Sequence, residues 1–88
     1  MANFNFGIDC SSTESAESLV AKISDTDIYQ DGLDAEDERV SVISHQALLE
    51  VLKKFAAENS EALTVEVWPE DMEYDEADDS GDLEVHSF

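Results

Sequence analysis

The sequence predicts an α+β domain: a small sheet of three to five strands, with two amphipathic helices on one of its faces. Three short segments alternate apolar and polar residues, which is typical of half-buried strands. Two longer segments repeat apolar residues at intervals of three and four, which is typical of amphipathic helices. At 88 residues, the chain fits a single domain with a thin core.

The first predicted strand covers residues 3–9 and places its apolar side chains on one face: Phe4, Phe6 and Ile8. Ser11 and Glu14 follow with the S-x-x-E spacing of a helix capping box. A helix is predicted over residues 12–24, because apolar residues recur there at helical spacing: Ala16, Leu19, Val20 and Ile23.

A second strand and helix follow an acidic, glycine-containing stretch at residues 25–38, in which Ile28 and Tyr29 are compatible with a short edge strand. Residues 39–43 are β-branched and alternating, which predicts a strand. Ser44 is predicted to cap a second helix that ends near residues 59–60 and has the apolar stripe Leu48, Val51, Leu52 and Phe55.

The last strand of the predicted core covers residues 63–68 and is stopped by Pro69. If Ile28 and Tyr29 do form a strand, the order of elements is that of the ferredoxin-like βαββαβ arrangement. The core domain is therefore predicted over residues 1–69.

Residues 70–88 are predicted to form an acidic C-terminal extension. They contain nine carboxylates and no lysine or arginine, a composition typical of solvated tails. Leu83 and Val85 are nevertheless compatible with one more edge strand at residues 83–85, after a turn at Ser80 and Gly81.

The charge of the chain is its most unusual property. There are 23 acidic residues and four basic ones, and the formal net charge is −19. Of the acidic residues, 17 lie in two segments, 25–38 and 66–84. Because such self-repulsion lowers the stability of the folded chain, it indicates a cationic partner or a need for solubility.

We expect the two acidic segments to form the partner-binding surface. Carboxylates at alternate positions of an extended chain lie about 6.6–6.8 Å apart, a spacing comparable to that of phosphates along a DNA strand. Asp71, Glu73 and Asp75 have this alternation. Trp68 and Tyr74 are candidate aromatic anchors. The predicted partner-binding residues are Asp31, Asp34, Glu36, Asp37, Glu38, Glu66, Trp68, Glu70, Asp71, Glu73, Tyr74, Asp75, Glu76, Asp78 and Asp79.

In size, acidity, scarcity of lysine and arginine, and α+β layout, the chain resembles the phage-encoded DNA mimics, although no motif is shared. The resemblance implies an anti-CRISPR or anti-restriction inhibitor that occupies the basic nucleic-acid-binding surface of a host defence complex and excludes DNA. It implies a protein partner and no direct binding of nucleic acid. The alternatives are an immunity protein or antitoxin that neutralises a cationic toxin such as a nuclease, and an acidic domain whose charge serves solubility only.

Metal sites and catalysis are not expected, and the prediction is a protein without cofactor that is not an enzyme. From Asp27 to Glu38 the chain matches an EF-hand calcium loop only in part, because Tyr29 stands where a ligand is required. Cys10, His45 and His86 lack the close pairing of zinc ligands. Three glycines do not make a phosphate-binding loop, and no carboxylate pair stands out as catalytic.

A cytoplasmic location is expected, that of the host if the chain is phage-encoded. The N-terminus lacks the basic and apolar regions of a secretory signal, and one cysteine cannot form an internal disulfide. No apolar run reaches the roughly 20 residues of a membrane span, and the acidic surface would be repelled by anionic lipids. Both a monomer and a homodimer are compatible with the sequence.

Overall fold

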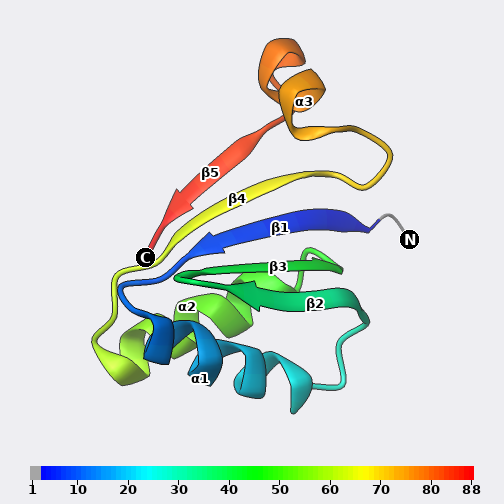
Figure 1. Cartoon of the computed structure of the whole chain (residues 1–88). Helices are drawn as coiled ribbons and strands as arrows, with labels where there is room; N and C mark the ends of the chain where they lie inside the picture. The colour runs from blue at the N-terminus through cyan, green and yellow to red at the C-terminus, as the bar shows by residue number, and fades with distance from the viewer. Residues whose placement is uncertain (1–2) are drawn as a thin grey trace.

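A computed structural model describes residues 3–88, which form one five-stranded antiparallel sheet and three helices (Figure 1). The elements in chain order are β1 (Phe4–Asp9), α1 (Thr13–Ser24), β2 (Gln30–Glu36), β3 (Arg39–Ser44), α2 (Leu48–Asn59), β4 (Thr64–Pro69), α3 (Tyr74–Ser80) and β5 (Glu84–Ser87). The predicted α+β class is confirmed.

The sheet has the strand order β2-β3-β1-β4-β5, so β1 is central and β2 and β5 are the two edges. β3 lies between β1 and β2 and separates the two strands that α1 connects. This order is compatible with the ferredoxin-like arrangement, with β5 added beside β4. All neighbouring strands pair antiparallel.

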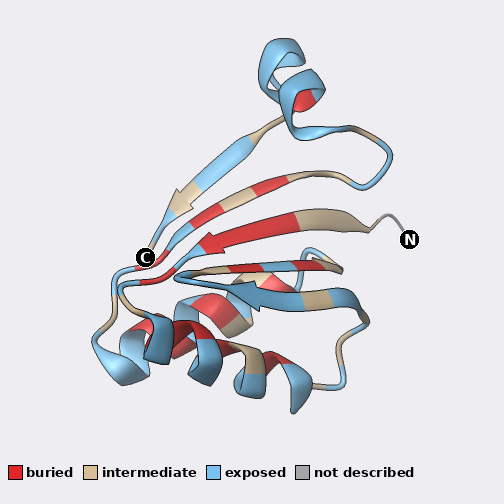
Figure 2. Ribbon diagram, viewed as in Figure 1, coloured by how far each residue is buried: buried red, intermediate tan, exposed pale blue. Residues whose placement is uncertain are grey.

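α1 and α2 lie side by side on one face of the sheet (Figure 1). Their apolar stripes contribute fully buried residues such as Leu19, Ile23, Leu48 and Leu52. The strands face them with alternate residues, including Phe6, Ile8, Val40, Val42, Val65 and Val67. Figure 2 shows the burial pattern: the central strands are marked by buried residues, whereas β2 and β5 are mostly exposed.

Both predicted helix caps are displaced in the structure. α1 begins after Ser12, whose Oγ accepts a hydrogen bond from the N–H of Ser15 at 3.1 Å, and not after Ser11. Ser44 is not a cap, because it ends β3, is fully buried and donates its hydroxyl to the carbonyl of Tyr29 at 2.5 Å. A buried hydroxyl needs such a partner, and the carbonyl that precedes β2 supplies it.

The position of β2 also differs from the prediction, which placed a short strand at Ile28 and Tyr29. The strand starts at Gln30 and continues through the acidic residues to Glu36. Its stability comes from backbone pairing with β3 and from Leu33, which packs against the core, and not from a run of apolar residues. Because residues 30–36 are extended, the chain from Asp27 to Glu38 does not form an EF-hand loop.

The acidic residues 70–88 form α3 and β5. Ala77 of α3 is fully buried, and Phe88 exchanges backbone hydrogen bonds with Leu63 at 2.9 and 3.0 Å. The edge strand predicted at residues 83–85 exists as β5, one residue later at its start, and pairs with β4. Within residues 3–88, no helix is long and apolar enough to cross a membrane.

Candidate functional site

The sheet face opposite α1 and α2, called the open face below, carries most of the polar residues of the four strands β1 to β4. The strand registers align them in three rows across the sheet. The first row is Asp31, Ile43, Asn5 and Trp68; the second is Asp34, Ser41, Gly7, Glu66 and Val85; the third is Glu36, Arg39, Asp9, Thr64 and Ser87. Directly paired residues of antiparallel strands project to the same face, so each row is a set of neighbours.

One edge of the open face is a line of three carboxylates along β2: Asp31, Asp34 and Glu36. Asp31 and Asp34 are three positions apart, so a regular strand would place them on opposite faces. A β-bulge between them takes up one extra residue, because they pair with Ile43 and Ser41, which are only two positions apart. Gly32 permits the bulge with a left-handed backbone, at φ 62°. All three side chains are exposed and unpaired by any basic group within residues 3–88.

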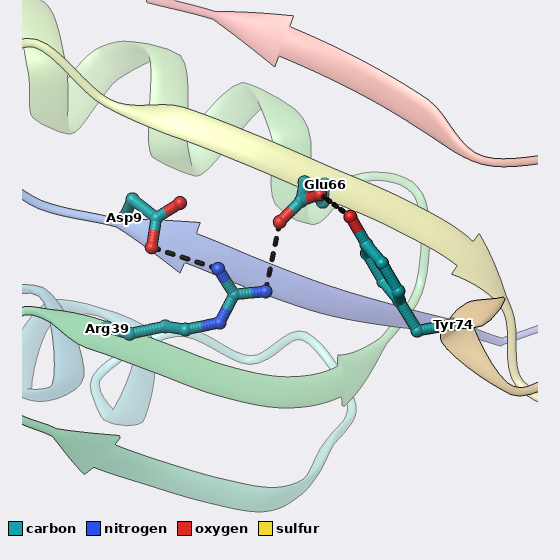
Figure 3. Close-up of polar contacts among 4 residues, drawn as sticks. All are labelled: Asp9, Arg39, Glu66 and Tyr74. Carbon is teal, nitrogen blue, oxygen red and sulfur yellow. Dashed lines mark hydrogen bonds and ion pairs between the residues drawn. The ribbon is translucent and has the colours of Figure 1, made fainter. Parts of the chain in front are cut away.

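The centre of the open face is partly neutralised by Arg39. Its guanidinium donates to Asp9 at 2.9 Å and to Glu66 at 3.1 Å (Figure 3). These contacts need Gly7, because a Cβ at that position would lie 2.2 Å from Nη2 of Arg39. Burial alone would lower the pKa of Arg39, but the hydrogen bonds from its guanidinium to Asp9 and Glu66 raise that pKa above its usual value. The three residues together carry a net charge of −1.

Tyr74 connects the acidic helix α3 to the same network. Its hydroxyl donates to the second carboxylate oxygen of Glu66 at 2.6 Å (Figure 3). Its ring contacts Trp68 edge to face, with ring centroids 5.3 Å apart. The hydrogen bond to Glu66 raises the pKa of Tyr74 above its usual value. These contacts hold the first turn of α3 against the open face.

The second set of acidic residues lies beyond β4, on the opposite side of the sheet from β2. The turn after β4 contains Glu70 and Asp71, Glu73 precedes α3, and α3 itself presents Asp75, Glu76, Asp78 and Asp79 to solvent. The row predicted from Asp71, Glu73 and Asp75 is wrong, because these residues lie in a turn, at a helix cap and within a helix. The structure has an extended carboxylate row, but it is on β2.

The remaining predicted site residues, Asp37 and Glu38, form the turn between β2 and β3. Asp37 has a left-handed backbone at φ 54°, which aspartate tolerates better than most residues. Together with Asp9, Asp34, Glu36, Arg39 and Ser41, the two residues line a hollow of about 320 Å³ at this end of the open face. The structure thus brings together Asp34, Glu36, Asp37 and Glu38 at one edge.

Sequence reasoning missed Asp9, Arg39 and Gly7 as parts of this surface. The alternation of β1 does place Gly7 and Asp9 on its polar face, so a signal for them existed. Arg39 is the one basic residue outside the two large helices, which is a second signal. Neither signal says that the two meet, because that depends on the pairing of β1 with β3.

The distribution of charge between the two layers is strongly unequal. α1 and α2 contain four carboxylates and three lysines, a net charge of −1. The rest of the chain therefore holds 19 of the 23 carboxylates and one of the four basic residues, a net charge of −18. Three of these 19 carboxylates, Asp25, Asp27 and Glu61, lie in the segments next to the helices, and the other 16 lie in the sheet, the turns that follow β2, β4 and α3, and α3 itself.

Metal ligation and thiol chemistry find little support in the geometry. Within the described residues, no group of three or more histidine, cysteine, aspartate and glutamate side chains is arranged to hold a metal ion. Cys10 is buried. Its pKa is raised to about 11, mainly by burial and to a smaller extent by the nearby carboxylates of Glu61 and Asp9. The thiol therefore stays protonated near neutral pH and has little nucleophilic character.

Comparisons with protein-family models, with curated proteins and with solved structures found no match to this chain.

Proposed function

We propose that this protein is a DNA-mimic inhibitor that binds the basic nucleic-acid-binding surface of another protein, of the anti-CRISPR or anti-restriction kind, and so excludes DNA. The observation that carries the proposal is the presence of two acidic margins on one surface, separated by a centre that Arg39 partly neutralises. One margin is the β2 row with the turn that follows it, and the other is the turn after β4 with α3.

The dimensions of this surface support the proposal. Neighbouring strands lie about 4.8 Å apart, so β2 is about 14 Å from β4 and about 19 Å from β5 across the sheet. The second margin begins where β4 ends, so its nearest part lies about 14 Å from β2 across the sheet, comparable to the width of about 12 Å between the phosphate rows that border the major groove of B-DNA. The longest dimension of the molecule, 33 Å, is close to one turn of the duplex, about 34 Å.

The partly neutralised centre distinguishes this arrangement from a uniform polyanion. Arg39 holds Asp9 and Glu66 in fixed positions and removes one unit of negative charge between the margins. A duplex likewise has its charge along two lines, with uncharged base edges between them. The bound protein would use for these carboxylates the lysine and arginine side chains that otherwise contact phosphate.

The proposal is tested by competition. The chain is immobilised, proteins bound from a bacterial lysate are purified, and each is assayed for binding of labelled duplex DNA with and without the chain. We expect at least one binder whose DNA binding the chain abolishes competitively, with an affinity that falls steeply as salt rises. A binder that is a toxin and that does not bind duplex at the same surface would overturn the proposal in favour of an immunity protein.

Position dependence provides the sharper arm of this test. The triple variant Asp31→Asn, Asp34→Asn and Glu36→Gln removes the β2 row, and Glu14→Gln, Glu17→Gln and Glu58→Gln removes the same charge from the exposed helix surface. Charge-assisted hydrogen bonds contribute about 1.5–3 kcal/mol each, whereas diffuse attraction contributes a few tenths. We expect the first variant to lose more than tenfold in inhibition and the second less than threefold, as roughly follows from these energies. Equal losses would mean that only total charge matters.

A further inference from the structure

We infer that the open face contains a binding site for one arginine side chain of the partner protein, in the hollow between the β2 bulge and Trp68. This inference deepens the proposed function and rests on it. The hollow has a volume of about 240 Å³ and crosses β3 and β1 between the two acidic margins. Its lining residues on the open face include Gly32, Ser41, Ile43, Asn5 and Trp68.

The chemistry of the lining suits an arginine side chain. Ile43 is half-buried and offers an apolar floor for the methylene groups of the side chain. Trp68 offers an indole ring, the aromatic group on which guanidinium stacks best. The Nδ2 group of Asn5 donates a hydrogen bond to the carbonyl of Pro69 at 3.0 Å, which leaves Oδ1 of the same amide as an acceptor.

The charge around the hollow selects a cation. Asp31 is the direct neighbour of Ile43 in the first row, and Glu66 lies next to Trp68 in the adjacent row. Gly32, which carries no side chain, lines the β2 end of the hollow. The surrounding carboxylates would repel an anionic group, and they would lose hydration beside a purely apolar one. A guanidinium instead forms charge-assisted hydrogen bonds with them.

The protein already binds one guanidinium on this face, that of Arg39. Its side chain crosses the strand at Gly7, where a missing Cβ leaves room, and is held between two carboxylates (Figure 3). The hollow lies one row further along the sheet, on the side of Trp68. It combines the same elements, a gap at a glycine and flanking carboxylates, with an aromatic ring in addition.

The test uses two peptides, hexa-arginine and hexa-lysine, and the intact chain at about 150 mM salt. Both peptides carry the same charge, so the general attraction to the acidic margins is equal. Trp68 is the only tryptophan, and its fluorescence therefore reports the hollow directly. We expect hexa-arginine to change this fluorescence and to bind about two- to fivefold more tightly than hexa-lysine. Both cations attract the ring, but only the planar guanidinium stacks on it while pairing with a carboxylate through two N–H groups, and the expected difference is of the size of one exposed contact of this kind.

Two variants separate the hollow from the charge. Trp68→Leu should remove the preference for arginine, measured by anisotropy of labelled peptides, by weakening hexa-arginine binding more than hexa-lysine binding. Tyr29→Leu removes an exposed aromatic residue outside the hollow and should keep the preference. Equal affinity of the native chain for both peptides, with no fluorescence change specific to arginine, would overturn the inference even if Trp68→Leu were unstable. That outcome is independent of the DNA competition assay, so failure of the site and failure of the proposed function are distinguishable.

Discussion

The helix layer and the open face of this 88-residue protein differ in net charge and in the apolar surface that they bury. The two helices have a net charge of −1 and bury their apolar stripes against the sheet, so they resemble those of an ordinary small domain. The open face, its turns and α3 hold the excess charge and bury little apolar surface. The difference shows that an extreme net charge can be kept out of the helices that cover the core, so that the repulsion acts mainly among the residues of the sheet surface, its turns and α3.

The largest expected effect breaks the helix layer. Leu52→Ala removes a fully buried side chain of α2 and should lower the free energy of unfolding by about 2–5 kcal/mol, because the core is thin and closes poorly around a cavity. The triple variant of the β2 row should leave this free energy unchanged or raise it slightly, since it relieves repulsion. Urea denaturation followed by circular dichroism measures both. A β2-row variant as unstable as Leu52→Ala would show that the two regions are not separable.

A smaller effect is expected at the bulge that builds the β2 row. Gly32→Ala places a Cβ on a left-handed residue and should cost about 1–2 kcal/mol, measured by the same denaturation experiment. Gly32→Asn is the matched control, because asparagine tolerates this conformation, and it should cost less. Deletion of Gly32 converts the bulge to a regular strand and keeps Asp34 and Glu36 on the open face, so partner binding should survive it. Loss of binding on deletion would show that the bulge itself is recognised.

This bulge also marks where sequence reasoning stopped working. Phe4, Phe6 and Ile8 gave a clean period of two, and Leu48, Leu52 and Phe55 a clean helical period, so β1 and α2 could be predicted. In β2 the only large apolar residue is Leu33, and the alternation changes phase at Gly32. A mostly exposed edge strand buries few side chains, so its sequence need not alternate apolar and polar residues.

The candidate site was predictable in composition and not in geometry. The acidic segments of the sequence are the acidic margins of the structure, because runs of carboxylates must face water whatever the fold. The extended row was assigned to Asp71, Glu73 and Asp75, but Ala77 anchors that segment as a helix by burying its side chain. The contact of Arg39 with Asp9 and Glu66 joins three strands, and such cross-strand contacts depend on register, which the residues of one strand do not specify.

The smallest expected effect sharpens the comparison at the centre of the open face, through a double-mutant cycle on Gly7 and Arg39. Gly7→Ala puts a Cβ into the space of the guanidinium, and Arg39 can escape only by giving up Asp9 and Glu66. Arg39 is partly exposed, and pairs of this kind contribute about 0–1 kcal/mol each. Loss of both pairs is partly offset by the gain of alanine over glycine in a strand, about 0.5–1 kcal/mol, so the single variant should lower stability by at most about 1.5 kcal/mol. In the background of Arg39→Gln, the space is no longer needed for a guanidinium. There Gly7→Ala should instead raise stability by about 0.5–1 kcal/mol, because glycine is unfavourable within a strand.

The measured quantity is the coupling free energy of the cycle, obtained from urea denaturation of the four proteins. A change of sign between the two backgrounds assigns Gly7 to the accommodation of Arg39. The same effect in both backgrounds would mean that the glycine serves the strand alone and that the partly neutralised centre of the open face does not depend on this contact.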